Sequence, residues 1–316
     1  MDRIIGEYTQ DLPGPLFICI GGMHGNERAG IRAIDLVLRM LKTEILSNPD
    51  FNFRGTFIGL IGHVAASLKG VRFIEKDLNR MWTSENIKAI IGQEFSSLGA
   101  EEQELLKLEN TIRKEITRTG TDRVVILDLH TTSADGGIYT IVPSDHKSIR
   151  IARQLIAPVV LGMLEKLKGT TLHYFNSDNF PVETISLCFE AGQHQDPMSV
   201  NRAVAVMVKC MRHIGCIKGK DVENRHLKIL REYANKLPNI TRLAYRHAIN
   251  STDHFEMLPG FKNFDRIHAG QLLATDKSGN IAALCDGYIL MPLYQVQGED
   301  GFFVVNDVDD TIFHSS

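Results

Sequence analysis

The chain has 316 residues, of which 43% are hydrophobic and 23% are charged, so it is long enough for one large globular domain with a smaller appendage. This composition excludes a largely disordered chain, and the formal net charge of −3 excludes the broad basic surface that nucleic acid requires. No segment reaches the ~18 apolar residues of a membrane span, and the N-terminus lacks the apolar run of a signal peptide. With five cysteines and no CxxC pair, we expect reduced thiols and a cytoplasmic location.

Apolar segments of strand length alternate with amphipathic helical patterns over the first two thirds of the chain. The expected strands cover residues 16–21, 55–61, 123–129 and 184–189. The expected helices cover residues 29–46, 101–117, 149–167 and 197–213. Unbroken apolar strands that alternate with helices are typical of a sheet buried on both faces. The pattern therefore predicts an α/β fold with a mostly parallel or mixed sheet flanked by helices.

The pattern changes near residue 215. A helical segment over residues 221–237 precedes short alternating segments that are broken by Gly, Asp and Asn. These expected strands cover residues 242–249, 271–275, 280–283, 287–292 and 301–305. The sequence DKSGN at Asp276–Asn280 indicates a hairpin turn. We therefore expect two domains, an α/β domain over residues 1–215 and a smaller β-rich domain over residues 216–316.

The segment GGMHGNERAG, residues 21–30, lies between a predicted strand and a predicted helix. Ligands of open α/β sheets bind in this position, beyond the carboxyl ends of the strands. His24 and Glu27 form an H-x-x-E pair, and side chains three residues apart on a helical turn point to the same side. Imidazole and carboxylate are common zinc ligands. A phosphate-binding loop is the alternative, but the segment lacks both the Lys-Ser/Thr of a P-loop and the spacing of G-x-G-x-x-G.

Two more strand ends carry residues of the same kinds. His130 ends the strand RVVILDLH and is a candidate third ligand, which leaves one coordination position for water as in catalytic zinc sites. Asp128 points to the same face; it either orients a ligand or is a buried acid satisfied by backbone donors. Glu190 follows the strand TISLCF and is a candidate general base that passes a proton from water to a leaving amine.

The segment GVRFIEKDLNRMW, residues 70–82, supplies Arg72, Asn79 and Arg80. The planar fork of an arginine binds a carboxylate with two hydrogen bonds, and an arginine near a metal can also stabilise a developing oxyanion. We expect Trp82, at the end of this segment, to fill the core.

Other polar residues lack this context. The acidic run Glu101–Glu104 is predicted to be a solvent-exposed helix start. Four further histidines are interpreted as surface or packing residues: His63, His194, His254 and His268.

The motifs GGMHGNE, RFIEKDLNR, LDLH and FEAG, taken in this order, resemble the aspartoacylase/succinylglutamate desuccinylase family, which is built on the zinc-carboxypeptidase fold. The resemblance covers residues 16–194 and, more loosely, the rest of the chain. It implies one Zn²⁺ per chain, held by His24, Glu27 and His130. It also implies that the C-terminal β-rich domain partly covers the active site.

The same resemblance assigns four further roles. It implies that Glu190 is the general base and then the general acid, and that Arg72 assists the carbonyl oxygen. It implies that Asn79 and Arg80 hold a substrate carboxylate.

Two substrate-binding residues of aspartoacylases have no counterpart here. An additional Arg about ten residues before the general base binds the amino-acid carboxylate in aspartoacylases, whereas residues 176–189 contain no Arg and Phe180 falls near that position. Aspartoacylases also bring a Tyr from the C-terminal part, where GEDGFF offers Phe302 and Phe303, which cannot donate a hydrogen bond. These changes argue against N-acetylaspartate as the substrate.

The sequence therefore predicts a zinc-dependent amidohydrolase that cleaves the amide bond of a small anionic N-acylated amino acid. Two alternatives stay open, a metallocarboxypeptidase that acts on peptides and a zinc-containing binding protein without turnover. A binding protein does not need a general base, which favours an enzyme. We expect neither nucleic acid nor a membrane as a partner; the acyl group, the amine and any homo-oligomer stay undetermined.

Overall fold

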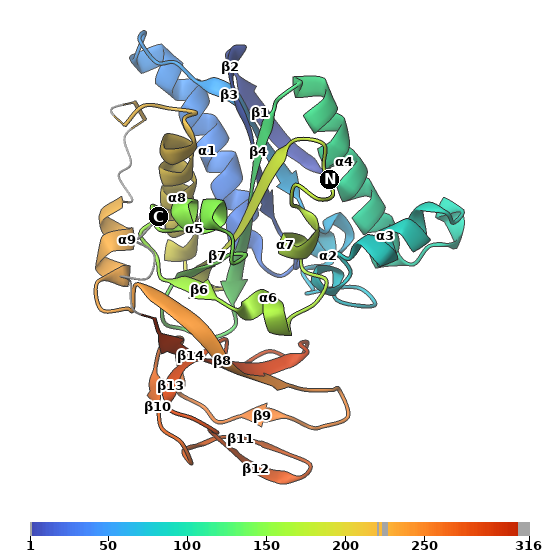
Figure 1. Cartoon of the computed structure of the whole chain (residues 1–316), viewed down its shortest axis with the longest axis vertical. Coiled ribbons are helices and arrows are strands. Elements are labelled where there is room, and N and C mark those ends of the chain that lie inside the picture. Colours follow the sequence, from blue (N-terminus) through green and yellow to red (C-terminus); the bar gives the residue numbers. More distant parts are fainter. Residues whose placement is uncertain (1, 220, 223–226, 309–316) are drawn as a thin grey trace.

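A computed structural model describes residues 2–219, 221–222 and 227–308 (Figure 1). These residues form an 11-stranded mixed sheet with the strand order β1-β3-β2-β4-β7-β5-β6-β8-β14-β13-β10, and a smaller sheet with the order β12-β11-β9. The strands of the large sheet are β1 (Ile4–Thr9), β2 (Leu12–Gly21), β3 (Arg54–Ile61), β4 (Arg123–Thr132), β5 (Tyr139–Ile141), β6 (Val159–Leu161), β7 (Glu183–Gln193), β8 (Ile240–Ala248), β10 (Arg266–Ile267), β13 (Gly287–Leu290) and β14 (Asp300–Asp307). Those of the small sheet are β9 (Glu256–Met257), β11 (Leu272–Asp276) and β12 (Gly279–Ala282).

Helices pack against both faces of the sheet, as Figure 1 shows for α1 and α8 on one side and α4 on the other. The α-helices are α1 (Arg28–Ser47), α2 (Val64–Lys69), α3 (Ser84–Ile91), α4 (Ala100–Thr119), α5 (His146–Ala152), α6 (Met163–Lys166), α7 (Thr171–Tyr174), α8 (Met198–Ile214) and α9 (Leu227–Ala234). The predicted fold class is confirmed: a mixed sheet flanked by helices, with a β-rich C-terminal part.

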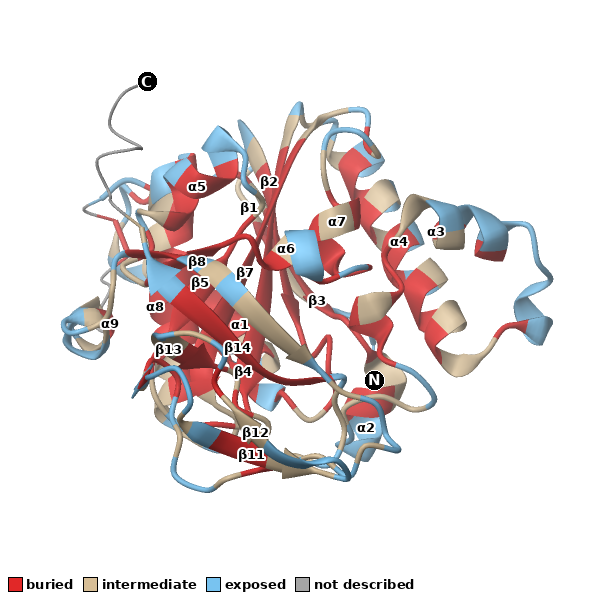
Figure 2. Cartoon of the chain, turned by 60° about the horizontal axis from the view of Figure 1, so that its bottom comes forward, coloured by how far each residue is buried: buried red, intermediate tan, exposed pale blue. Residues whose placement is uncertain are grey.

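Alternation along β2 explains why both faces are covered. Phe17 points to the face where α1 and α8 pack, whereas Ile18 points to the face of α4, and both side chains are fully buried. A strand buried on both faces needs apolar residues at every position, which is the unbroken apolar pattern of the sequence. Figure 2 shows these central strands as buried and much of α3 as exposed.

The strands β2, β4 and β7 are adjacent and parallel, so their carboxyl ends lie at one edge of the sheet. In this register Gly21 lies beside Leu129, and His130 lies beside Glu190. The turn that follows β2 therefore comes next to His130. Register, rather than sequence distance, brings these segments together.

The C-terminal strands extend the same sheet. β8 pairs in parallel with β6, and β14 pairs antiparallel with β8. The hairpin expected at Asp276–Asn280 joins β11 to β12. The division into domains at residues 215 and 216 stays a prediction.

Two predicted helices differ from the structure. The segment 149–167 forms α5, β6 and α6 instead of one helix, because Pro158 cannot donate a backbone hydrogen bond and Gly162 adopts a φ of 80°. In the segment 221–237 the described helix is α9, and residues 223–226 lie outside the described part of the chain. Within the described ranges, no helix is long and apolar enough to cross a membrane.

Candidate active site

The turn between β2 and α1 carries the H-x-x-E pair. Glu27 donates its backbone N–H to the carbonyl of His24 over 3.0 Å, and α1 begins at Arg28. The pair therefore lies on a turn that precedes the helix, which corrects the expectation of a helical turn. Gly25 is required there, because a Cβ would lie 2.1 Å from the carbonyl carbon of Ala66.

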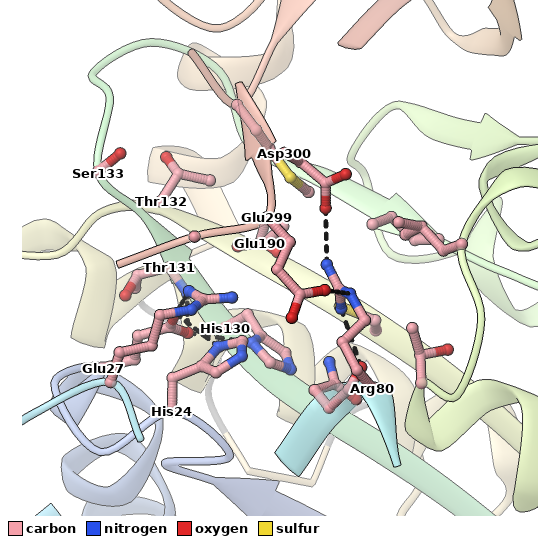
Figure 3. A pocket seen from close by; sticks show the side chains of 18 of the residues that line it. His24, Glu27, Arg80, His130, Thr131, Thr132, Ser133, Glu190, Glu299 and Asp300 are labelled. Carbon is pink, nitrogen blue, oxygen red and sulfur yellow. Dashed lines mark hydrogen bonds and ion pairs between the residues drawn. The ribbon is translucent and has the colours of Figure 1, made fainter. Parts of the chain in front are cut away.

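His24, Glu27 and His130 meet at the edge of the sheet (Figure 3). Their candidate ligand atoms all lie within 4.8 Å of one another, and the three side chains are buried. The Glu27 carboxylate lies between the imidazoles: Oε1 is 2.9 Å from Nδ1 of His24, and Oε2 is 3.0 Å from Nδ1 of His130. Both Nδ1 atoms therefore face the same carboxylate.

The other nitrogen of each imidazole faces its own carboxylate. Nε2 of His24 lies 3.1 Å from Oδ1 of Asp77, and Nε2 of His130 lies 3.1 Å from Oδ2 of Asp128. Asp128 also accepts a hydrogen bond from the Thr171 hydroxyl over 2.7 Å, so its contacts include side chains rather than the backbone donors of the alternative interpretation. A carboxylate behind a ligating histidine fixes its orientation and increases its basicity.

Asp77 was not predicted from the sequence. It is buried, and besides His24 it accepts the backbone N–H of Asn79 over 2.8 Å and a hydrogen bond from Arg72 over 2.9 Å. The sequence offered one signal, the position of Asp77 inside the motif RFIEKDLNR. Its partner in the fold, 53 residues away, became visible only in the structure.

These residues fit a zinc ion. Zinc prefers imidazole nitrogen and carboxylate oxygen, and bonds of about 2.1 Å in a tetrahedron place neighbouring ligand atoms ~3.4 Å apart. The contacts of 2.9 and 3.0 Å between Glu27 and the two imidazoles are close to that spacing. A carboxylate behind each imidazole completes the arrangement typical of zinc sites.

Electrostatics keep the central carboxylate ionised. Burial opposes the charge of Glu27, but His24 and His130 outweigh burial and hold the pKa of Glu27 well below its usual value. Burial is likewise outweighed at Asp77, where His24 and Arg72 hold the pKa well below its usual value. A carboxylate that is already ionised can bind a cation without first releasing a proton.

Glu190 lies within β7, one strand away from the histidines. The strand is longer than predicted, and Glu190 pairs with His130 on one side and with Tyr139 of β5 on the other. Its Oε2 atom is buried and has no hydrogen-bond partner among the described residues. Burial raises the pKa of Glu190 to about 8 in the metal-free chain. A carboxyl group with a raised pKa is suited to both accept and return a proton near neutral pH.

The three residues of the predicted basic segment also line the cavity. Arg72 Nη1 lies 3.6 Å from Oε1 of Glu27, next to the three candidate ligands. Asn79 and Arg80 belong to a 3₁₀ helix, Leu78–Arg80, whose N-cap is Asp77. Asn79 accepts the backbone N–H of Thr171 over 3.0 Å, which fixes its amide at the cavity wall.

The cavity has a volume of about 110 Å³, and every predicted site residue lines it. Residues from the C-terminal part close one side of it: Met291, Leu293, Gln295, Gly298, Glu299, Asp300 and Phe303. In Figure 3, Glu299 and Asp300 lie beside Arg80, across the cavity from His24.

Other predicted residues lie elsewhere. Phe180 packs in the core over Arg113, whose guanidinium carbon is 4.4 Å from the ring centroid, and does not line the cavity. Phe302 stacks on His247, whereas Phe303 lines the cavity wall. Trp82 fills the core, as predicted, between Tyr174 and Phe175.

Two of the histidines interpreted as packing residues have specific partners. His63 is fully buried and contacts Oε1 of Glu101 over 3.0 Å. His194 connects the hydroxyl of Thr131, 2.7 Å from its Nδ1, to Gln295, 3.2 Å from its Nε2. His194 therefore links the candidate site to the C-terminal part.

The acidic run in the first turn of α4 was predicted to be exposed, but two of its acids are buried. Glu101 is fully buried, and it accepts the backbone N–H groups of Ile74 and Glu75 besides its contact with His63. Glu104 is 5% exposed and pairs with Arg3. Glu101 therefore holds the segment that carries Arg72 and Asp77.

Comparisons with known proteins identify a family for this chain. Residues 13–214 match the family model described as the succinylglutamate desuccinylase/aspartoacylase catalytic domain. Succinylglutamate desuccinylase from Pseudomonas fluorescens (strain SBW25) is 26% identical over 263 residues, which cover 81% of this chain and 71% of the relative. A probable aspartoacylase from Acaryochloris marina is 31% identical over 129 residues, or 41% of this chain and 39% of the relative.

Solved structures share the fold. Succinylglutamate desuccinylase/aspartoacylase from Rhodobacter sphaeroides superposes with a TM-score of 0.65 at 18% identity, covering 95% of this chain and 87% of that one. Murine aminoacylase 3 superposes with a TM-score of 0.60 at 17% identity, covering 94% of this chain and 96% of that one. Since the family model matches most of the chain, the resemblance seen in the motifs is confirmed: the chain belongs to the succinylglutamate desuccinylase/aspartoacylase family.

Proposed function

We propose that this protein is a zinc-dependent hydrolase that cleaves the amide bond of a small N-acylated amino acid. The observation that carries the proposal is the convergence of His24, Glu27 and His130 beside an unpartnered, buried Glu190 in one cavity. Family membership supports the reaction class, since the matched relatives are named desuccinylases and aspartoacylases.

His24, Glu27 and His130 would hold one zinc ion, with Asp77 and Asp128 orienting the imidazoles. Zinc supplies Lewis acidity, which polarises a carbonyl and lowers the pKa of water to about 7. Glu190 takes the proton from the attacking water, because its Oε2 atom is buried and has no competing partner among the described residues. It then returns this proton to the amide nitrogen, which leaves as an amine.

Arg72 and Arg80 interact with different negatively charged groups of the substrate. Arg72, next to the candidate ligands, stabilises the negative charge that develops on the carbonyl oxygen. Asn79 and Arg80 bind a substrate carboxylate at the far side of the cavity.

A peptide substrate is the second candidate. Residues of the C-terminal part line one side of the cavity, which favours a small substrate over a peptide. A binding protein without turnover is disfavoured by Glu190, because binding alone does not require a buried proton acceptor.

The test combines metal analysis with turnover of Glu190→Gln. We expect about one zinc per chain in both proteins, and a loss of turnover on the order of 10²–10⁴-fold in the variant. Glu183→Gln is the matched control, since Glu183 lies at the other end of β7 and pairs with Lys147 and Arg123 on the surface. Undiminished turnover in Glu190→Gln would remove Glu190 from the mechanism, and failure of His24→Ala to lose zinc would remove the proposed metal site.

A further inference from the structure

Arg80 already interacts with carboxylates of the protein itself. Its Nη2 atom donates to Oδ2 of Asp300 over 2.7 Å, and Nη1 donates to the backbone carbonyl of Asn79. Its Nε atom lies 3.6 Å from Oε2 of Glu299. Figure 3 shows both carboxylates beside the guanidinium. A second arginine, Arg246, donates to the remaining Asp300 oxygen over 2.6 Å, which holds Asp300 in place.

The two contacts of Arg80 differ in strength. Asp300 is 9% exposed and bonded to two guanidinium groups, so a substrate does not displace it easily. Glu299 is 53% exposed and too far from Nε for a hydrogen bond, so it can move away at little cost. Arg80 therefore has one free side, with room for one carboxylate.

The charged side chains that line the cavity also limit the substrate to one carboxylate. Glu27 and Glu190 lie at the end of the cavity with the candidate metal ligands, whereas Glu299 and Asp300 line it beside Arg80. Arg72 is also partnered, since it donates to Asp77. Among the described residues that line the cavity, neither arginine offers a second free side to a further substrate carboxylate, and burying an unpaired charge is costly.

One part of the cavity wall is apolar. It is formed by side chains from β5, α6, α7 and the C-terminal part: Ile141, Leu164, Leu167, Leu172, Met291 and Phe303. All six belong to, or pack against, one hydrophobic cluster between the middle of the sheet and β14. Because this wall is part of the core, it keeps its shape and favours an apolar group.

We infer that the substrate carries a single carboxylate, bound by Arg80, and that its remaining substituent is uncharged and apolar. Asp300 and Glu299 determine this specificity, because their carboxylates already neutralise the positive charge of Arg80 that a second substrate carboxylate would need. The inference rests on the proposed function and names the substrate class of that same site. It separates this chain from relatives whose names refer to succinylglutamate and aspartate, which carry additional carboxylates.

Matched substrate pairs test the inference with zinc-loaded protein. N-isocaproylalanine and N-succinylalanine differ by an isopropyl group in place of a carboxylate of the same shape. N-acetylleucine and N-acetylaspartate differ in the same way on the amino-acid side. We expect kcat/KM for the apolar member to be higher in both pairs, by at least about tenfold, because unpaired or like charges brought close together in a binding site disfavour binding. A preference for the dicarboxylate in either pair overturns the inference.

Two variants assign the effect to the acidic pair. Glu299→Gln and Asp300→Asn each remove one negative charge beside Arg80, so each should reduce the apolar preference, by about tenfold or more for the buried Asp300 and by less for the exposed Glu299. Glu165→Gln is the matched control, since Glu165 is exposed on α6, pairs with Arg242 and does not line the cavity. Glu299→Gln changes an exposed residue and should be well tolerated. If this variant and Asp300→Asn both leave the preference for the apolar substrate unchanged, the assignment is overturned.

Binding separates this inference from the proposed function. Calorimetry with zinc-loaded Glu190→Gln measures the affinity for the same four compounds without requiring turnover. If the wild-type protein cleaves none of them, the proposed function fails. The affinities still decide the inference: tighter binding of the apolar members supports it, and tighter binding of the dicarboxylates or no binding at all overturns it.

Discussion

Replacing Asp77 by Asn tests the candidate metal site without touching a ligand. The carboxylate of Asp77 accepts three hydrogen bonds, from Nε2 of His24, from Arg72 and from the backbone N–H of Asn79. The amide keeps one acceptor oxygen but loses the negative charge, and its NH₂ group cannot accept a hydrogen bond from His24 or from Arg72. His24 would lose the partner that holds its ring and increases its basicity.

The size of the effect follows from these contacts. Loss of a carboxylate behind a ligating histidine reduces metal affinity by roughly 10–100-fold, or about 1.4–2.7 kcal/mol. We expect the upper part of this range, because Asp77 also positions Arg72 and Asn79. Asp128→Asn should have a smaller effect, since the polar side-chain contacts of Asp128 among the described residues are those with His130 and Thr171.

Zinc affinity is measured by competition with a chromophoric chelator at pH 7.5, with the melting temperature of the metal-free protein recorded in parallel. Asp35→Asn is the control, because Asp35 lies on α1 with a partly exposed side chain that pairs with Arg39. An Asp77→Asn protein that stays folded and binds zinc as tightly as the wild type would refute the role of Asp77, and with it the geometry assigned to His24.

Three further predictions concern stability. In the metal-free chain burial raises the pKa of Glu190 to about 8, above its unfolded value, so ionisation costs more folding free energy as the pH rises from ~4 toward 8. In chelator-treated protein Glu190→Gln should therefore raise the urea midpoint at pH 8 and leave it unchanged near pH 4; equal midpoints at both pH values would contradict this. Trp82→Ala should cost about 3–5 kcal/mol in urea unfolding, since Trp82 is fully buried; a loss below ~1 kcal/mol would show that the site collapses. Glu101→Gln should cost about 1–3 kcal/mol, because two backbone N–H groups and His63 lose a charged acceptor; an unchanged midpoint would mean that the amide replaces it.

The pattern of apolar residues in the sequence is enough to predict most strands of the central sheet. The strands β2, β3, β4 and β7 were predicted because a strand buried on both faces needs a continuous apolar run, and α1, α4 and α8 because one helical face must be apolar. The pattern failed at residues 149–167, where apolar spacing is compatible with a helix. Pro158 and Gly162 divide that segment into α5, β6 and α6.

The candidate ligands could also be found from the sequence, because each follows or ends a buried strand. Parallel strands bring their carboxyl ends to one edge, so His24, His130 and Glu190 were expected to be neighbours once the sheet was predicted. That inference needs strand direction and order, and no knowledge of side-chain contacts.

The tertiary structure determines which charged side chains lie beside these residues. Asp77 behind His24, Glu101 beneath the arginine segment and Asp300 on Arg80 join positions 53, 27 and 220 residues apart. In the sequence each of these acids looks like an ordinary surface carboxylate, since side-chain type does not reveal which loops will bury it. Composition and periodicity determined the sheet and its helices, because burial repeats at short intervals along the chain. The polarity of the substrate pocket depended on the tertiary structure, because its charges come from segments whose meeting is set by strand register and by the path of the C-terminal part.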